Sequence, residues 1–75
     1  MKKISFNDLC KIQAGGCYHL SEKFTHLKDF VEGDYTLIYA SNDSKDINCH
    51  FFNESTGISL TITANEAQYL DIYEL

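Results

Sequence analysis

The feature that most constrains the fold of this chain is a series of three short strand-like runs in its second half. They cover residues 35–40, 47–52 and 58–63. Each is rich in the β-branched and aromatic residues that favour strands. In the third, Ile58, Leu60 and Ile62 alternate with polar residues and are expected to face the core. Loops of six and five residues separate the runs, which is too short for the crossover that parallel strands need. The pattern therefore predicts a three-stranded antiparallel meander.

The two faces of this predicted sheet differ in character. In the second run the inward residues are expected to be Ile47, Cys49 and Phe51, and the outward ones Asn48, His50 and Phe52. The first run is apolar on both sides, so its sequence does not indicate which face is buried. Gly57 suits a positive φ before the last strand. Antiparallel sheets tolerate one wet face, but an aromatic-rich wet face indicates contact with another molecule.

The first half of the chain shows helical rather than alternating spacing. Ser5 and Asp8 resemble a capping box, and they precede a short amphipathic helix that Gly15-Gly16 ends. A second helix is predicted between Ser21 as its N-cap and Gly33 after its last turn. Its apolar residues recur four, three and four positions apart at Leu20, Phe24, Leu27 and Val31.

The tail after the third strand carries a second capping box, formed by Thr63 and Glu66. The apolar stripe that follows at helical spacing comprises Tyr69, Ile72 and Tyr73. This pattern predicts a C-terminal helix, and a fourth strand is the alternative. Glu74 would lie at the negative end of the helix dipole, which is an unfavourable place for a carboxylate.

The predicted fold class is α+β in the order α-α-β-β-β-α. It consists of two short N-terminal helices, a three-stranded antiparallel meander sheet and a C-terminal helix. Residues 1–75 form a single domain, because a chain of 75 residues is too short for two cores. Hydrophobic residues make up 44% of it and aromatic residues 13%, which is enough to build one small core.

Composition also bounds the location of the protein. No apolar run is long enough to span a bilayer, and no secretory hydrophobic segment follows Lys2 and Lys3. Three cysteines, an odd number, are typical of free thiols in a reducing compartment. Cys10 and Cys49 are expected to be small buried apolar residues. We therefore expect a cytoplasmic protein that does not bind membranes.

The stretch QAGGCYHL places Cys17 and His19 close together after two glycines. A thiolate at a helix N-terminus beside an imidazole could serve as a nucleophile, but neighbours in sequence seldom form a catalytic pair. We expect no enzyme activity and no catalytic residue. No pair of Cys or His residues has the spacing typical of a zinc site, so no metal or other cofactor is expected. The simplest role of Gly15-Gly16 is a joint at which the chain reverses between two helices.

The N-terminal segment also resembles the double-glycine leaders of bacteriocin and microcin precursors. Such leaders place an apolar residue, a serine, an acidic residue, a leucine and an isoleucine at set spacings before Gly-Gly. The matching residues here are Ile4, Ser5, Asp8, Leu9 and Ile12. The spacing fits Ala14-Gly15 as the small pair and is one residue too long for Gly15-Gly16. The resemblance covers about a fifth of the chain, and it implies a precursor with a leader at residues 1–16.

Charge divides the chain unevenly. Residues 1–30 hold five lysines and three acidic residues, a net charge of +2, whereas residues 31–75 hold one lysine and eight acidic residues, a net charge of −7. The acidic half is not expected to bind nucleic acid directly, because phosphates would repel it. It suits a protein partner with a basic surface.

These observations favour a small acidic protein-interaction module. Motif-free proteins of this kind are common among phage and mobile-element inhibitors, such as anti-CRISPR and anti-restriction proteins. We therefore expect an inhibitor of a nucleic-acid-handling host enzyme whose carboxylates stand in for phosphates. The alternatives are the precursor with a double-glycine leader at residues 1–16, and an antitoxin or immunity protein. The expected partner-binding residues are Asp43, Asp46, Glu54, Tyr69, Asp71, Tyr73 and Glu74. A homodimer formed through an exposed strand edge is also expected to be possible.

Overall fold

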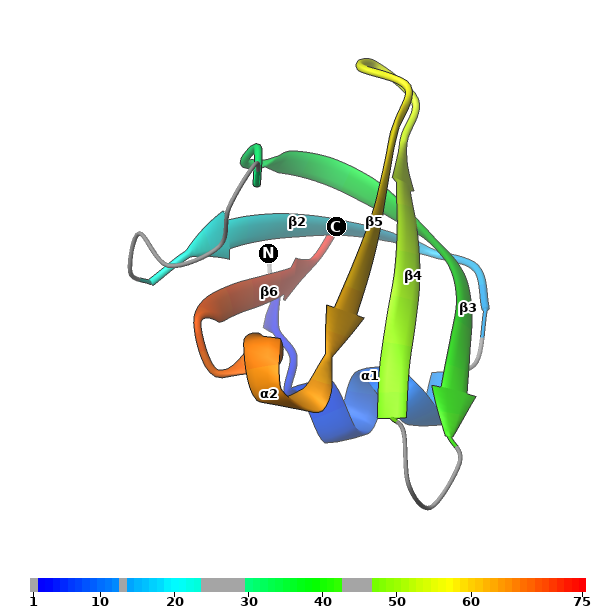
Figure 1. The fold of residues 1–75 in the computed structure, drawn as a ribbon, viewed down its shortest axis with the longest axis vertical. Coiled ribbons are helices and arrows are strands. Elements are labelled where there is room, and N and C mark those ends of the chain that lie inside the picture. Colours follow the sequence, from blue (N-terminus) through cyan, green and yellow to red (C-terminus); the bar gives the residue numbers. More distant parts are fainter. Residues whose placement is uncertain (1, 13, 24–29, 43–46) are drawn as a thin grey trace.

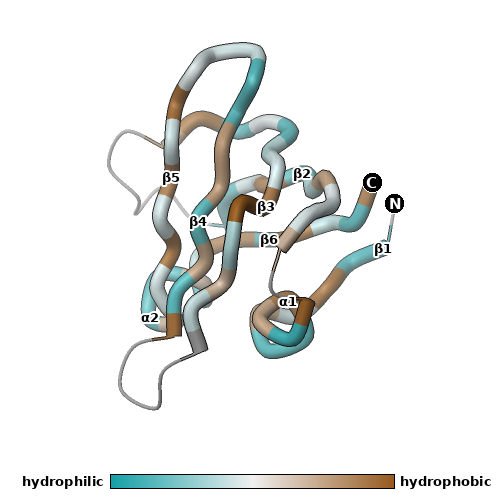
Figure 2. The backbone as a smooth tube through the Cα atoms, turned by 90° about the vertical axis from the view of Figure 1, so that its right-hand side faces the viewer, coloured by the Kyte–Doolittle hydropathy of each residue, from teal (hydrophilic) through white to brown (hydrophobic). Residues whose placement is uncertain are grey.

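The computed structural model describes residues 2–12, 14–23, 30–42 and 47–75, in which six strands form one antiparallel sheet (Figure 1). The elements in chain order are β1 (Lys2–Lys3), α1 (Phe6–Ile12), β2 (Cys17–Glu22), β3 (Gly33–Asn42), β4 (Ile47–Asn53), β5 (Ile58–Thr63), α2 (Ala64–Ala67) and β6 (Leu70–Glu74). Across the sheet the strand order is β1-β6-β2-β3-β4-β5. Because β1 pairs with β6, the two ends of the chain lie close together, as Figures 1 and 2 both show.

The sheet curls around one core. β3 is ten residues long, and its register with β4 shifts between Leu37 and Tyr39, where a bulge bends the strand. In Figure 1, β4 and β5 run steeply across the direction of β2 and β6, and β3 curves between the two sets. Inside the curl the Tyr18 ring packs edge-on against the Phe51 ring, with centroids 6.3 Å apart. The buried apolar residues are Leu9, Cys10, Tyr18, Leu20, Tyr35, Leu37, Cys49, Phe51, Ile62, Leu70 and Ile72.

Helix α1 forms as predicted and closes one end of the core. The Ser5 hydroxyl accepts a hydrogen bond from the Asp8 N–H at 3.2 Å, so Ser5 caps the helix. Leu9 and Cys10 are buried on its inner side, where α1 packs on β3 and β4. Both views place α1 at the lower end of the curled sheet (Figure 1, Figure 2).

The predicted meander is present as β3, β4 and β5. Cys49 and Phe51 are buried and alternate with outward-facing residues, as the sequence indicated. Tyr35 and Leu37 are the buried residues of β3, whose faces the sequence did not distinguish. Gly57, in the turn before β5, has a φ of 74°, which is the left-handed conformation that was expected at this position. Ile58, which was expected to face the core, is 37% exposed next to that turn.

The predicted fold class is nevertheless wrong, because the described chain is mostly a six-stranded sheet with two short helices. Strand β2 stands where the second N-terminal helix was predicted to begin. Its alternate residues Tyr18 and Leu20 are buried, and pairing with β3 and β6 satisfies its backbone on both sides. Residues 24–29 of the predicted helix lie outside the described residues, and Val31 is exposed.

The predicted C-terminal helix is wrong beyond its first turn. The capping box is present, since the Glu66 N–H donates to Thr63 Oγ1 and the Thr63 N–H donates to Glu66 Oε1, each at 3.2 Å. The helix α2 nevertheless ends at Ala67, and β6 begins three residues later. As a strand this segment buries both Leu70 and Ile72 between β1 and β2. It also avoids the unfavourable placing of an acidic residue at the negative end of a helix.

Candidate functional site

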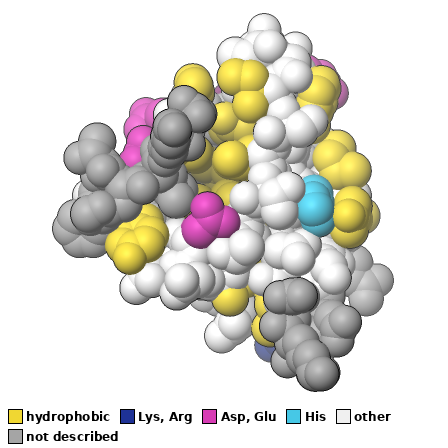
Figure 3. Space-filling view, in the orientation of Figure 1, with side chains coloured by type: hydrophobic (Ala, Val, Ile, Leu, Met, Phe, Trp, Pro, Cys, Tyr) yellow, Lys and Arg dark blue, Asp and Glu magenta, His cyan; other side chains and the backbone are white. Residues whose placement is uncertain are grey.

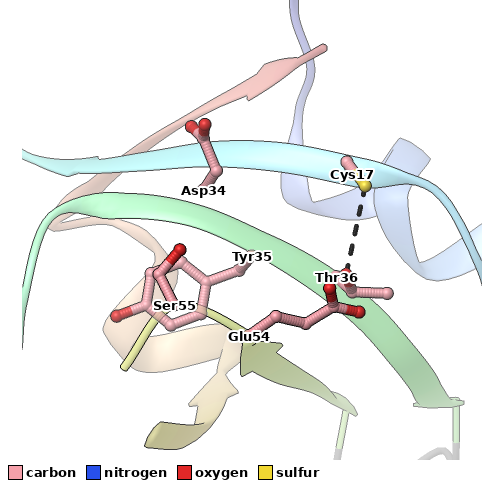
Figure 4. A pocket seen from close by; sticks show the side chains of 6 residues that line it. All are labelled: Cys17, Asp34, Tyr35, Thr36, Glu54 and Ser55. Atoms are coloured by element: carbon pink, nitrogen blue, oxygen red, sulfur yellow. Dashed lines mark hydrogen bonds between the residues drawn. The ribbon is translucent and has the colours of Figure 1, made fainter. Parts of the chain in front are cut away.

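An open pocket of about 150 Å³ lies where the start of β3 meets the turn between β4 and β5. Figure 4 shows that its side chains come from β2, β3 and this turn. Each of them carries an oxygen or a sulfur atom: Cys17, Asp34, Tyr35, Thr36, Glu54 and Ser55. Two are carboxylates and none is basic. The pocket therefore presents hydrogen-bond acceptors and negative charge.

His19 on the neighbouring strand holds Asp34 in place. The two residues face each other in the β2–β3 register, and the His19 Nδ1–H donates to Asp34 Oδ1 at 2.8 Å. His19 Nε2 lies 3.7 Å from Glu32 Oε2, so one imidazole spans two carboxylates. The Glu32 and Asp34 side chains remain 64% and 66% exposed. Both carboxylates are therefore accessible to another molecule.

Glu54 reaches the pocket because the turn between β4 and β5 has a fixed shape. Asn53 Oδ1 accepts the backbone N–H groups of Ser55 at 2.9 Å and Thr56 at 3.2 Å. Asn53 is itself buried, and a Cβ added to Gly33 would lie 3.3 Å from its Nδ2, so the turn rests closely against the start of β3. Sequence reasoning saw only a run of turn-forming residues here and missed the positioning role of Asn53.

Cys17 lines the pocket but is not joined to His19. Its Sγ lies 4.0 Å from Thr36 Oγ1, whereas both ring nitrogens of His19 face carboxylates. The other two cysteines are buried, as predicted, with their Sγ atoms 3.7 Å apart. Burial raises the pKa of the Cys49 thiol to about 12, and the adjacent Cys10 thiol adds to this shift. A buried thiol that stays protonated is a poor nucleophile.

The outer face of the meander carries an aromatic row that consists of Tyr39, His50 and Phe52. Tyr39 and His50 face each other in register, and their rings stack with centroids 4.1 Å apart and planes 22° from parallel. The hydroxyl of Thr61 lies 3.0 Å from His50 Nδ1 on the next strand. Ile38 and Tyr39 are 50% and 49% exposed, because the bulge in β3 turns both outward. Figure 3 shows one face of the molecule on which hydrophobic side chains flank a histidine and acidic side chains are also visible.

The residues predicted to bind a partner fall in separate places. Asp43 and Asp46 lie outside the described residues. Glu54 lines the pocket, as described above. Asp71 instead forms an ion pair with Lys3 at 2.8 Å and a longer one with Lys23 at 3.7 Å. The negative charge of Asp71 is thus already offset by the lysines of this chain.

The other three predicted residues lie on or next to β6. Tyr69 and Tyr73 are half-buried, and Tyr73 is opposite His19 in the β2–β6 register. Glu74 is exposed and opposite Tyr18, whose hydroxyl has a raised pKa because of burial and, secondarily, the charge of Glu74. Sequence reasoning missed Glu32 and Asp34 as site residues. The available signal was their position on either side of the glycine that starts β3.

The segment that resembles a leader is part of the described fold. β1 pairs with β6, and α1 places Leu9 and Cys10 in the core. The Gly15 N–H donates to the Leu37 carbonyl at 2.8 Å, and the Leu37 N–H donates to the Gly16 carbonyl at 3.1 Å. Both glycines have a positive φ. This arrangement favours the interpretation of Gly15-Gly16 as a joint at which the chain turns. The joint connects α1 to β2, rather than two helices as predicted.

Within the described ranges, no three His, Cys, Asp or Glu side chains come together in a group that could hold a metal ion. None of the helices there is long and apolar enough to cross a membrane. Comparisons with protein-family models, curated proteins and solved structures found no match to this chain. Its function therefore has to be inferred from the arrangement of its own residues.

Proposed function

We propose that this protein is a small acidic interaction module that binds a basic surface of a protein partner and so inhibits an enzyme that handles nucleic acid. Carboxylates at the binding surface take the place of phosphates, and they occupy the lysine or arginine side chains that hold the nucleic acid. The proposal depends on one observation, a group of three exposed carboxylates in and beside the pocket. This acidic surface consists of Glu32, Asp34 and Glu54.

The acidic surface is not neutralised by the lysines that the structure describes. Lys3 and Lys23 pair with Asp71, and Lys11 lies 3.8 Å from Asp8 on the same helix. No salt bridge between described residues joins a lysine to the acidic surface, which has only the imidazole of His19 beside two of its carboxylates. Exposed charges of one sign attract an oppositely charged surface and accelerate its association. This supports a partner that brings its own cations.

The acidic surface is also held in a fixed arrangement before any partner binds. The hydrogen bond from His19 fixes Asp34, and the side chain of Asn53 fixes the turn that carries Glu54. Groups that are already ordered lose little conformational entropy when they bind. Asp34 and the turn that carries Glu54 therefore need not be ordered by the partner.

Charge alone gives fast association rather than tight binding, and the aromatic row supplies the apolar contact that charge lacks. Phe52 is opposite Thr36 of the pocket wall in the β3–β4 register, so the row begins beside the pocket. Tyr39 and Ile38 extend it along β3 with about half of their surfaces exposed. Acidic and aromatic side chains on one sheet face fit a partner surface that mixes arginine or lysine with apolar residues.

The first experiment is capture of the partner from the source cell on the immobilised full chain, with mass spectrometry of the retained proteins. The expected result is a nucleic-acid-handling enzyme that dissociates when NaCl rises from about 50 mM to about 500 mM, because salt screens exposed charges. Addition of this chain should then reduce the binding of DNA or RNA by the captured enzyme. A retained protein that keeps full binding to nucleic acid in excess of this chain would contradict the inhibitor proposal.

Two charge-reversal variants locate the binding surface. Glu54→Lys should weaken binding of the captured enzyme about tenfold or more, since it turns attraction into repulsion at the pocket. Asp8→Lys makes the same change in net charge on α1, which lies at the other end of the curled sheet from the turn between β4 and β5 (Figure 1), and should have a much smaller effect. Equal losses from both variants would mean that only net charge matters. Capture of a toxin rather than a nucleic-acid enzyme would show that the chain is an antitoxin or immunity protein.

A further inference from the structure

The sheet has two outer edges within the described residues, and they are built differently. The edge strand β1 is two residues long, and both residues are lysines, which discourages pairing with another chain. The edge strand β5 has six residues, Ile-Ser-Leu-Thr-Ile-Thr, without a charge or a proline. No described strand pairs with the outer side of β5. Its backbone donors and acceptors there are available to a further strand.

The inward side of β5 is also incompletely covered. Ile62 is 1% exposed, Leu60 is only partly buried, and Ile58 is 37% exposed. The inward residues of β5 are therefore less buried the closer they lie to the turn between β4 and β5. A strand added beside β5 would remove more of Ile58 and Leu60 from water, which is favourable in proportion to the apolar area buried.

We propose that this edge is a homodimer interface, in which β5 pairs antiparallel with β5 of a second copy of this chain. With the twofold axis at Leu60, Ile58 lies beside the partner's Ile62 and Ser59 lies beside the partner's Thr61. Each pair joins two inward or two outward residues, so the faces of the two sheets stay in register. The result is a continuous sheet across the two copies.

Charge favours a second copy over a basic partner at this edge. The chain has a net charge of −5, so two copies repel each other over most of their surfaces. β5 brings no charged side chain to the seam and thus opposes no like charges there. A basic partner would gain no ion pair from β5 and is attracted to the acidic surface instead. This inference does not depend on the proposed inhibitory function.

Analytical ultracentrifugation of the full chain tests the proposal, at concentrations from about 10 μM to about 1 mM. We expect a monomer–dimer equilibrium that shifts toward the dimer between about 0.15 M and about 0.5 M NaCl, because salt screens the repulsion between acidic copies. Ser59→Lys places like charges near each other across the seam, and it should weaken dimerisation about tenfold or more. The matched control Asn7→Lys on α1 makes the same change in net charge and should not weaken it.

NMR spectroscopy locates the interface. Amide signals of residues 58–63 should shift as the concentration rises, and their exchange with solvent should slow as the strands pair. The same spectra show whether each variant is folded, and if Ser59→Lys is not, the shifts of the unmodified chain decide the question. A chain that stays monomeric at about 1 mM in both salt concentrations overturns the proposal. Concentration-dependent shifts confined to β1 or the acidic surface overturn it as well.

Discussion

The two parts of the curled sheet use their charged and apolar residues in different ways. In the β1-β6-β2 part, Asp71 is paired with Lys3, and Leu20 of β2 is buried together with Leu70 and Ile72 of β6. In the β3-β4-β5 part, Asp34 and Glu54 have no lysine partner among the described residues, and Ile58 at the outer edge is exposed. In the first part, the charge of Asp71 is offset by lysines of the same chain. The second part has carboxylates and apolar side chains available for contact.

This difference shows that the net charge of a segment does not indicate which of its charges are available. The acidic residues of the second half all look alike in sequence. Lys3 lies near the start of the chain and Asp71 near its end, but β1 and β6 are neighbours in the sheet and bring the two together. We infer that the β1-β6-β2 part contributes mainly to stability and the β3-β4-β5 part mainly to binding.

The largest expected effect comes from comparing one leucine in each part, Leu20, which is buried, and Leu60, which is partly buried. Leu20→Ala in β2 should lower the free energy of unfolding by about 3 kcal/mol, because Leu20 is 0% exposed and its removal leaves a cavity. Leu60→Ala in β5 should cost about 1 kcal/mol, because that side chain is already partly in water. Urea denaturation followed by circular dichroism measures both values. Equal losses would show that the edge at β5 is as well packed as the middle of the sheet.

The next largest effect is a loss of stability at alkaline pH, caused by the buried thiols of Cys10 on α1 and Cys49 on β4. The ordinary pKa of the Cys49 thiol is 9.0, and burial, together with Cys10, raises it to about 12 in the folded chain. A raised pKa stabilises the folded state fully below 9.0, and this contribution is lost as pH rises from 9.0 toward 12, since the unfolded chain loses the proton first. Stability should therefore fall as pH rises from about 9 toward about 12, and it should fall less steeply in Cys49→Ala.

Cys17→Ala is the matched control for this pH dependence. Cys17 is exposed and is not part of the buried pair of Cys10 and Cys49, so this variant keeps that pair and the pH dependence that the pair causes. Comparison of slopes rather than absolute values removes the cost of the small cavity that Cys49→Ala creates. Identical slopes in all three proteins would contradict a raised pKa for the Cys49 thiol.

Local signals in the sequence were the most reliable guide to the fold. The capping residues Ser5 and Thr63 both receive the hydrogen bonds expected of them, because a cap depends only on residues within one turn. The positive φ of Gly57 and the order of β3, β4 and β5 were also predicted correctly. Short loops and alternating residues determine these features within about thirty residues of chain.

Features that depend on distant pairing were not predicted. Tyr18 and Leu20 belong to a strand because β3 and β6 flank it. No pattern in the neighbouring sequence predicts that β6 pairs with this strand. The same applies to the site. Glu54 was expected to bind a partner, but Glu54 and Asp34 line the same pocket only because a turn packs on another strand. The pairing of Asp71 with a lysine sixty-eight positions away could be found only in the folded chain.

The smallest expected effect distinguishes a carboxylate that is paired within the chain, such as Asp71, from one without a lysine partner among the described residues, such as Glu54. Asp71 is 22% exposed at its side chain and bound to Lys3, and the hydrogen bond and charge of Asp71 raise the pKa of that lysine. This contribution to stability is complete below the ordinary lysine pKa of 10.5 and is lost as pH rises above it. At neutral pH, Asp71→Asn should therefore lower stability slightly, by less than Leu20→Ala does.

The loss should shrink in a Lys3→Met background, since that background has already lost the shorter ion pair and keeps only the longer contact between Asp71 and Lys23. Glu54→Gln, which removes a carboxylate without a lysine partner among the described residues, should leave the urea midpoint unchanged and weaken only the binding of a basic partner. If Asp71→Asn instead weakened binding and left stability intact, the assignment of the two parts of the sheet would have to be reversed. The urea midpoints and the partner affinities of Asp71→Asn and Glu54→Gln together show which carboxylate stabilises the fold and which binds another molecule.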